Sequence, residues 1–318
     1  MTPASFLPGE GRIGVLCGGV SSERDISLKS GRAVHDALVG AGFKARLIDA
    51  REDYMSTILE TPVDYVFVAL HGRMGEDGTV QRVLETAGIP YSGPGAEACR
   101  ISMDKALSRR RFEEVGLGNP RWAEFDDPAK ALAHRLSYPV FVKPVCGGSS
   151  IGTAMVSGAD GMPDAVRDAF AEDERILIEE RIAGREMAVG ILGDSALSPI
   201  EIRPKRAFYD FEAKYGDSGT EYLFPDDLEA AWIQELKCAA LLAYQALGLS
   251  GFSRIDMILA QDRIYLLEAN AIPGLTPKSL LPKQAARAGF GFAELCVKIM
   301  QSSLRSRPIN TPRGPQMM

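Results

Sequence analysis

Polar side chains that could bind a metal ion interrupt two apolar runs in the last third of the chain. Arg254 and Asp256 lie in the first run, whereas Glu268 and Asn270 lie at the end of the second. Because side chains alternate between the two faces of a strand, each pair shares a face. If the runs pair with Asp256 opposite Glu268, Arg254 falls opposite Asn270 and all four groups converge. Two carboxylates and an amide form an all-oxygen cluster that Mg²⁺ accepts, so Asp256, Glu268 and Asn270 are candidate metal ligands.

These two runs have the composition of buried strands. They extend from Phe252 to Ala260 and from Arg263 to Ala269, are rich in Ile, Leu, Met, Phe and Tyr, and enclose a predicted tight turn at Gln261-Asp262. The alternative is a surface hairpin whose polar face is in water. The apolar flanks and the Pro273-Gly274 that follows favour the metal site, because close carboxylates in an apolar setting repel unless a cation joins them.

Composition places the chain among ordinary globular proteins. Its 318 residues can form about two or three compact domains. Hydrophobic residues make up 46% and charged residues 25%, which is typical of globular proteins and not of disordered ones. The net charge of −6 argues against a general nucleic-acid binder, since such a protein would need a basic face.

No segment indicates secretion or membrane insertion. The N-terminal residues lack an apolar region of signal-peptide length, and no run approaches the ~20 apolar residues of a membrane helix. We therefore expect a cytoplasmic protein without a membrane partner. The five cysteines support this expectation, because they are widely spaced and include no C-x-x-C pair, a pattern typical of unpaired thiols in a reducing compartment. Cys146 could be a nucleophile, but it lacks an evident His partner, which favours a small residue without a catalytic role.

The first 95 residues alternate strand-like and helix-like segments. The pattern predicts, in order, a strand at Arg12–Cys17, a helix over Ser30–Ala41, strands at Lys44–Ile48 and Val63–Leu70, a helix at Thr79–Thr86 and a strand at Ile89–Tyr91. Such alternation indicates an α/β fold whose parallel sheet has helices on its faces. Ligands gather at the carboxyl ends of such strands, where Gly18-Gly19 and His71-Gly72 lie, so we expect His71 to contact substrate.

The rest of the chain mixes helices and strands without this regular alternation, which predicts an α+β organisation. The predicted helices are Ser102–Val115, Asp164–Phe170, Asp226–Leu247 and Phe292–Leu304. The predicted strands are Val140–Lys143, a returning strand that ends at Val156, Arg175–Glu180 and Met187–Leu192. A polar loop without clear periodicity lies between Pro204 and Pro225. A loop of about twenty residues is uncommon in a compact domain unless it has a function. The segment Phe208 to Tyr215 is also too aromatic for plain disorder, so we predict an active-site lid.

A glycine- and serine-rich loop at Gly147–Gly152 directly follows Lys143-Pro144. Glycines let backbone N–H groups approach phosphate oxygens closely, and the hydroxyls of Ser149 and Ser150 add donors. Lys143 would supply positive charge, which predicts a phosphate lid over a nucleotide. The alternative is a plain glycine-rich hairpin turn, and the loop is not a Walker A motif because no G-K-[ST] follows.

Acidic residues mark two further candidate positions. Glu23 follows Gly18-Gly19 at the turn into the first helix, where it could pair with an ammonium group. An acidic cluster that merely caps the helix is the alternative. Glu179 and Glu180 end a predicted strand, where the backbone could pair with an adenine edge and a carboxylate with ribose hydroxyls. Glutamates at strand ends are, however, usually solvated.

Together and in this order, these motifs closely resemble those of the D-alanine–D-alanine ligases of the ATP-grasp superfamily. The resemblance extends from about Gly14 to Leu304 and rests on the joint occurrence of GGVSSERDIS, ALHGRMGEDGTVQ, SMDK, VKP…GSSIG, FYDFEAKY, SRIDM and LEANAIPGLTPKSL. It implies three domains at residues 1–95, 96–182 and 183–318, with ATP between the second and third. One departure is Gly147, where relatives often carry a larger or acidic residue, and this implies a more mobile phosphate loop.

The resemblance also implies roles for individual residues. Phosphates would be contacted by Lys105, Lys143 and Lys214. The adenine would be framed by Glu179, Glu180 and Ile182, and the ribose by Glu186. Two Mg²⁺ or Mn²⁺ ions would be bound by Asp256, Glu268 and Asn270. The ammonium group of the first D-alanine would be held by Glu23, which is linked to the lid through Ser149 and Tyr215. The second D-alanine would lie at Ser279 and Leu280, and the oxyanion would face Arg254 and the N–H of Gly274.

The activity implied is ATP-dependent joining of two D-alanine molecules through an acyl phosphate, for peptidoglycan precursors, by an enzyme of a family in which homodimers occur. Ligases that join D-alanine to D-lactate or D-serine are the near alternative. Tyr215 favours the dipeptide, because relatives that accept the hydroxy acid carry other lid residues. A silent nucleotide-binding or scaffold protein is the alternative from another class. A binding module would need few of the groups retained here, namely the three lysines, Arg254, Asp256, Glu268 and Asn270.

Overall fold

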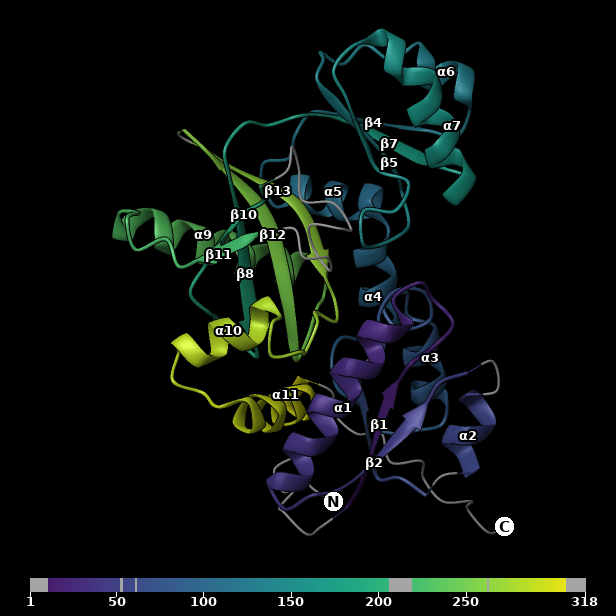
Figure 1. Ribbon diagram of the computed structural model, residues 1–318, viewed down its shortest axis with the longest axis vertical. Helices are drawn as coiled ribbons and strands as arrows, with labels where there is room; N and C mark the ends of the chain where they lie inside the picture. The colour runs from purple at the N-terminus through teal and green to yellow at the C-terminus, as the bar shows by residue number, and fades with distance from the viewer. Residues whose placement is uncertain (1–10, 52–53, 61, 206–218, 262, 307–318) are drawn as a thin grey trace, which may run out of the picture.

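The computed structural model describes residues 11–51, 54–60, 62–205, 219–261 and 263–306, which form three β-sheets with their helices. Two sheets share one hydrophobic core, to which the first and last parts of the chain contribute. The third has a core of its own and lies apart from the other two at the upper right of Figure 1. The predicted combination of α/β and α+β parts is confirmed.

The N-terminal sheet is parallel, as predicted, in the order β2-β1-β3. Its strands and the helices that follow them are β1 (Arg12–Cys17), α1 (Arg24–Gly40), β2 (Lys44–Asp49), α2 (Tyr54–Glu60), β3 (Tyr65–Val68) and α3 (Thr79–Thr86). Strand β3 is fully buried, as expected where helices cover both faces. The predicted strand at Ile89–Tyr91 is wrong. It is reduced to a single bridge between Val66 and Tyr91, because Pro90 has no N–H to donate.

The helix predicted over Ser102–Val115 is present, but it begins only at Lys105, and a helix that the sequence did not predict precedes it. The two helices are α4 (Ala96–Met103) and α5 (Lys105–Glu114), and the residue between them, Asp104, is extended with φ −83° and ψ 102°. Its side chain accepts a hydrogen bond from the N–H of Leu107, which caps the second helix. The break puts Lys105 at the first position of α5.

The central sheet is antiparallel, with strand order β4-β7-β5-β6. Its elements are β4 (Trp122–Phe125), α6 (Pro128–Leu132), β5 (Val140–Pro144), β6 (Ala154–Val156), a 3-10 turn (Ala159–Gly161), α7 (Met162–Glu172) and β7 (Ile176–Glu180). The helices α6 and α7 pack together, and α7 covers one face of the sheet (Figure 1). The sequence did not predict β4 or α6. The pairing of β5 with both β6 and β7 fixes where the chain enters the glycine-rich loop.

The C-terminal sheet has the order β11-β10-β8-β12-β13, with β9 paired to β8. Its strands are β8 (Arg185–Leu192), β9 (Ser195–Ala196), β10 (Ile200–Arg203), β11 (Glu221–Leu223), β12 (Phe252–Ala260) and β13 (Arg263–Asn270). The predicted ribbon β12–β13 is confirmed. Part of the predicted loop from Pro204 to Pro225 is instead strand β11, which pairs with β10. The aromatic segment of that loop, with Lys214 and Tyr215, lies outside the described residues.

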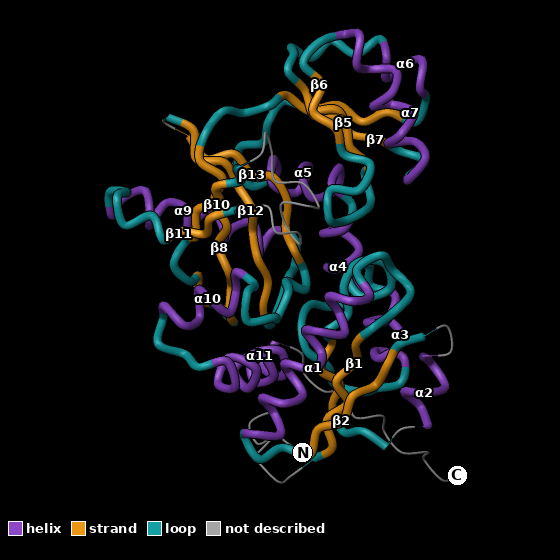
Figure 2. Tube along the Cα trace, in the orientation of Figure 1, coloured by secondary structure: helices purple, strands orange, loops and turns teal. Residues whose placement is uncertain are grey.

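Among the described residues, three helices complete the C-terminal part: α9 (Ala230–Ala246), α10 (Leu280–Arg287) and α11 (Phe292–Ser306). Helix α9 packs against β8, β12 and β13, whereas α11 packs against α1 as well as the sheet, as Figure 2 shows. The contact of α11 with α1 explains why the first and last sheets share one core. Within the described residues no helix is long and apolar enough to cross a membrane. All five cysteines are free thiols, as predicted.

Candidate functional site

A cavity of about 530 Å³ lies between the central and C-terminal sheets. Its walls come from the glycine-rich loop, the ends of β5 and β7, and strands β8, β12 and β13. The predicted site residues that line it are Lys105, Lys143, Ser149, Ser150, Glu179, Glu180, Ile182, Glu186, Asp256 and Glu268. Residues far apart in sequence therefore converge on one cavity, and cationic and anionic groups both face it.

The ribbon β12–β13 has the predicted register. Arg254 is paired with Asn270, and Asp256 with Glu268. The register shifts just after Asp256, which leaves Leu267 as an extra residue on β13. Such a bulge re-aims neighbouring side chains. The buried carboxylate of Asp256 accepts hydrogen bonds from Nε and Nη2 of Arg254 at 2.7 and 2.6 Å, so the two side chains form a bidentate ion pair.

The donor set at this end of the cavity fits a hard divalent cation. Asp256 and Glu268 border the main cavity, and Glu268 and Asn270 border an adjoining one of about 40 Å³. No group of three or more His, Cys, Asp or Glu side chains in the described residues could hold a metal ion. The two carboxylates and the amide would therefore supply only part of the coordination shell of a metal ion. Substrate oxygens would complete the shell, as is common for Mg²⁺ in proteins.

Glu179 is buried between two cations. Its carboxylate forms ion pairs with Lys143 of β5 and with Arg109 of α5, which is fully buried. Burial alone would raise the pKa of Glu179, but the charges of Arg109 and Lys143 outweigh it and lower the pKa below the ordinary glutamate value. The carboxylate of Glu180 points elsewhere and accepts from the N–H of Ser137 at 3.3 Å. The two glutamates therefore differ, and only Glu179 holds Lys143.

The glycine-rich loop closes the cavity above these residues. Ser149 and Ser150 have φ angles of 54° and 59°, in the left-handed region that non-glycine residues rarely adopt. The hydroxyl of Ser149 donates a hydrogen bond to Glu23, and the ammonium of Lys105 donates to the carbonyl of Gly147 at 2.7 Å. The conformation is therefore maintained by contacts with distant segments and is not that of a plain hairpin turn.

Glu23 precedes helix α1 at the N-cap position but does not cap it, because its side chain makes no capping hydrogen bond. Glu23 is 8% exposed, and its carboxylate is bonded to Ser149 instead. A Cβ atom on Gly72 would lie 2.5 Å from one of its oxygens, so only glycine allows the two loops to approach this closely. The alternative interpretation, in which Glu23 belongs to a simple cap cluster, is therefore wrong.

His71 lies outside the main cavity in a buried polar chain. One ring nitrogen is 3.0 Å from the hydroxyl of Ser30, and the other is 3.3 Å from a carboxylate oxygen of Glu76. Burial raises the pKa of Glu76. The same Ser30 hydroxyl accepts from the N–H of Leu275 at 3.4 Å. This chain joins the N-terminal sheet to the segment that contains Gly274.

The segment after β13 holds the remaining predicted residues. Ser279 immediately precedes α10, whose first residue is Leu280, but the Ser279 hydroxyl does not cap the helix. It instead accepts from the N–H of Thr276 at 3.1 Å, and it would lie 2.9 Å from a Cβ atom on Gly274. The turn is therefore tight, and a side chain at position 274 would collide with the Ser279 hydroxyl.

Several residues around the cavity were not predicted. Arg109 is four positions after Lys105, so both lie on one face of a helix, and this spacing could have revealed it. Glu76 follows His71 in the same glycine-rich segment, in which the sequence predicted a role only for the histidine. The arginines Arg181, Arg185 and Arg203 line the cavity, yet no local pattern distinguishes them from ordinary surface arginines.

Two family models match the chain. The model described as the D-ala D-ala ligase N-terminus matches residues 51–94, and that described as the D-ala D-ala ligase C-terminus matches residues 112–301. Among curated relatives, the D-alanine–D-alanine ligase of Geotalea uraniireducens is 42% identical over 295 residues, which cover 92% of this chain and 95% of that protein.

Solved structures agree in fold over nearly the whole length. The D-alanine–D-alanine ligase of Bacillus anthracis superposes with a TM-score of 0.83 at 34% identity, covering 93% of this chain and 98% of that one. Its complex with ATP gives a TM-score of 0.78 at 31% identity, with coverages of 93% and 98%. The VanG D-Ala:D-Ser ligase of Enterococcus faecalis gives a TM-score of 0.81 at 28% identity, with coverages of 91% and 98%.

Proposed function

The chain belongs to the D-alanine–D-alanine ligase family, and from this membership we propose that it joins two D-alanine molecules at the expense of ATP. The observation that carries the proposal is the convergence, on one cavity, of lysines, a glycine-rich loop and a carboxylate-bearing ribbon. A relative of the same fold has been solved with ATP bound. The products are D-alanyl-D-alanine, ADP and phosphate.

The chemistry explains why a nucleotide is needed. A carboxylate does not react with an amine in neutral water, so the carboxylate of the first D-alanine attacks the γ-phosphate of ATP and becomes an acyl phosphate. The amine of the second D-alanine then attacks the acyl carbon and expels phosphate. Each step develops charge that the protein must stabilise where it arises.

We assign the nucleotide to the main cavity. Lys105 and Lys143 contact its phosphates, and Lys214 outside the described residues would join them. Because Glu179 holds Lys143 in an ion pair, the ammonium is fixed before the nucleotide arrives. The hydroxyls and backbone of Ser149 and Ser150 cover the phosphates. At the end of β7, the adenine is framed by Glu179, Glu180 and Ile182. Glu186 of β8 accepts hydrogen bonds from the ribose hydroxyls.

The ribbon would hold two Mg²⁺ or Mn²⁺ ions through Asp256, Glu268 and Asn270. When bound, such ions neutralise phosphate charge and orient the transferring group. The bidentate pair with Asp256 keeps the guanidinium of Arg254 in one orientation beside these oxygens. Arg254 and the N–H of Gly274 are then assigned to the oxyanion, a type of contact worth about 3–4 kcal/mol where measured elsewhere.

Substrate recognition is assigned to the loops that border the N-terminal sheet. Glu23 accepts from the ammonium group of the first D-alanine, and the hydrogen bond from Ser149 couples it to the glycine-rich loop. His71 contributes through the buried chain with Ser30 that reaches Leu275. Ser279 and Leu280 hold the second D-alanine. Tyr215 would close the lid, which keeps water from the acyl phosphate.

Further properties follow from the same proposal. The three domains would span residues 1–95, 96–182 and 183–318, with the nucleotide between the last two. The enzyme would act in the cytoplasm as a homodimer and supply peptidoglycan precursor. Free thiols at all five cysteines support the reducing compartment.

Phosphate release from ATP and Mg²⁺ tests the proposal. The assay compares D-alanine alone, D-alanine with D-lactate or D-serine, and L-alanine. We expect release with D-alanine alone, no increase with D-lactate or D-serine, and no release with L-alanine. Faster release with D-serine or D-lactate would indicate one of the alternative ligases. Equal rates with L-alanine would refute the stereochemistry, and no release at all would refute the proposed activity.

A further inference from the structure

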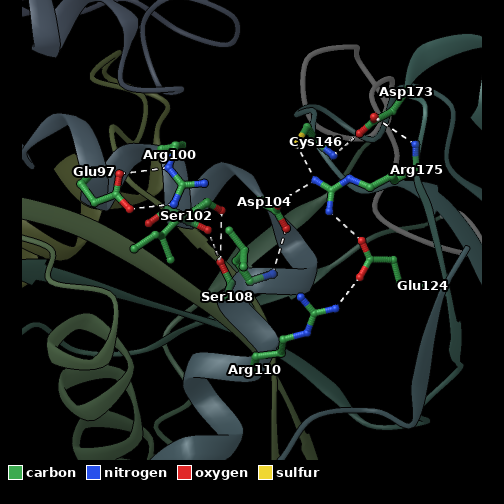
Figure 3. A network of polar contacts seen from close by, with 12 residues as sticks. Glu97, Arg100, Ser102, Asp104, Ser108, Arg110, Glu124, Cys146, Asp173 and Arg175 are labelled. Carbon is green, nitrogen blue, oxygen red and sulfur yellow. Dashed lines mark hydrogen bonds and ion pairs between the residues drawn. The ribbon is translucent and has the colours of Figure 1, made fainter. Parts of the chain in front are cut away.

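An ion-pair network lies at the start of the glycine-rich loop, on residues to which the proposed function assigns no role. Figure 3 shows its centre, where the guanidinium of Arg175 lies between Asp104 and Glu124. Nη2 of Arg175 donates to Oδ2 of Asp104 at 2.6 Å, and Nη1 donates to Oε1 of Glu124, also at 2.6 Å. Asp104 is buried and immediately precedes Lys105 in sequence.

The two carboxylate oxygens of Asp104 have separate partners. Oδ1 accepts from the N–H of Leu107 at 2.8 Å and thereby caps helix α5, while Oδ2 is the oxygen that faces Arg175. Helix capping therefore does not require Arg175. The arginine instead neutralises a buried negative charge one residue away from a lysine that is assigned to phosphates.

The backbone around Arg175 also holds the root of the loop. Its carbonyl accepts from the N–H of Val145 at 2.9 Å, and the carbonyl of Val145 accepts from the N–H of Lys105 at 3.1 Å. Next to them, the N–H of Cys146 donates to Asp173 at 2.6 Å. The ammonium of Lys105 then reaches Gly147. The start of the loop and the start of α5 are thus tied to the same short segment before β7.

We propose that Arg175 is a positioning residue that, by pairing with Asp104, keeps the ammonium of Lys105 directed to the nucleotide phosphates and to the glycine-rich loop. The inference rests on the proposed function, which assigns Lys105 to those phosphates. Without Arg175, the buried carboxylate of Asp104 lacks its cation, and Lys105 is the adjacent cationic residue. Asp104 and the phosphates then compete for one ammonium group.

The test is nucleotide binding by purified full-length protein, measured by calorimetry with a non-hydrolysable β,γ-imido analogue of ATP and with adenosine. In Arg175→Met the Kd of the ATP analogue rises by about tenfold, the change expected for one charged contact. The Kd of adenosine stays within about twofold, because it carries no phosphate. A purely structural defect would weaken both ligands or reduce only the fraction of protein that binds.

Substitution of Asp104 provides the decisive second arm. An asparagine still caps α5 but carries no charge, so Asp104→Asn combined with Arg175→Met removes the buried carboxylate that would compete with the phosphates for Lys105. We expect the double variant to recover binding of the ATP analogue to within about threefold of wild type. Arg175→Lys retains a neutralising charge and is expected to bind within about threefold as well.

Arg110→Met is the matched control, because Arg110 pairs with Glu124 at the outer end of the network and is half exposed. Its Kd values are expected to match wild type. Unchanged binding in Arg175→Met, or a double variant that binds the ATP analogue no better than Arg175→Met does, would overturn the inference alone. Failure of the wild type to bind the ATP analogue would overturn the proposed function, and this inference with it.

Discussion

The ribbon β12–β13 and the glycine-rich loop 147–152 border the same cavity but are held in place differently. Strand pairing on both edges of β12, with β8 and β13, fixes the ribbon and with it the register of its polar groups. The loop lies outside the strands. Its conformation depends on side chains from other segments, chiefly Lys105 at Gly147 and Glu23 at Ser149.

This difference separates two tasks. Groups that must be fixed relative to one another, the carboxylates of Asp256 and Glu268, lie on a ladder of backbone hydrogen bonds. Groups that must cover a ligand, the hydroxyls of Ser149 and Ser150, lie on a loop held by side-chain hydrogen bonds. Contacts with a ligand can replace these hydrogen bonds. The loop also belongs to a sheet with its own hydrophobic core, so ribbon and loop are parts of different packing units.

The largest expected effect concerns the ribbon. Glu268→Ala removes a carboxylate that lies opposite Asp256, so kcat is expected to fall by at least about 10³ while the fold is retained. Steady-state turnover and thermal unfolding are measured together. Glu294→Ala, which removes a half-exposed carboxylate on α11, is the control and should leave kcat unchanged. Activity of Glu268→Ala within a few-fold of wild type would contradict the role of the ribbon.

A second prediction concerns the junction between the two packing units. Arg109 is fully buried and pairs with Glu179, so Arg109→Leu leaves a buried carboxylate with one cation fewer and should destabilise the fold by about 3–5 kcal/mol. Urea unfolding measures the change. Arg110→Leu breaks a half-exposed pair and should cost at most about 1 kcal/mol. Equal losses in the two variants would mean that burial of Arg109 has no energetic importance.

The loop should respond more weakly than the ribbon. Ser149→Ala removes the hydroxyl that donates to Glu23, and the KM for the first D-alanine is expected to rise by about tenfold. The matched control is Ser157→Ala, at an exposed position after β6, which should leave KM unchanged. If Ser149→Ala also left KM unchanged, the contact would have no part in substrate binding.

The smallest effect tests the backbone of the loop. At φ 59°, Ser150 accommodates glycine without strain but not a β-branched residue. Ser150→Val should therefore be less stable than Ser150→Gly by about 1–2 kcal/mol in urea unfolding. Equal stability of the two variants would show that the left-handed conformation is not maintained in solution.

The same contrast explains what sequence reasoning could predict. The apolar composition of the two runs and the turn between them predicted the bounds of β12 and β13, and the assumption that Asp256 faces Glu268 predicted the pairing of Arg254 with Asn270. The shift in register after Asp256 was not predicted. The start of helix α5 was predicted too early, at Ser102, because the capping role of Asp104 in SMDK was not recognised. The short strands β9, β10 and β11 carry too few residues for a pattern.

Contacts between distant segments were the least accessible to sequence reasoning. The hydrogen bond between Ser149 and Glu23 was anticipated only through the family resemblance, because the two residues are 126 positions apart. The pairing of Arg175 with Asp104 spans 71 positions and has no local signature. Partners of this kind are determined by how the central sheet packs, which no spacing within either segment encodes.

Oxygen transfer tests the central claim most directly, which is that ATP activates the carboxylate of one D-alanine. The enzyme is supplied with ATP, Mg²⁺ and D-alanine labelled with ¹⁸O in its carboxylate, and the released phosphate is analysed by mass spectrometry. Attack of the carboxylate on the γ-phosphate predicts one labelled oxygen in each phosphate released, in step with dipeptide formation. Unlabelled phosphate, released while the dipeptide still forms, would contradict the acyl-phosphate mechanism.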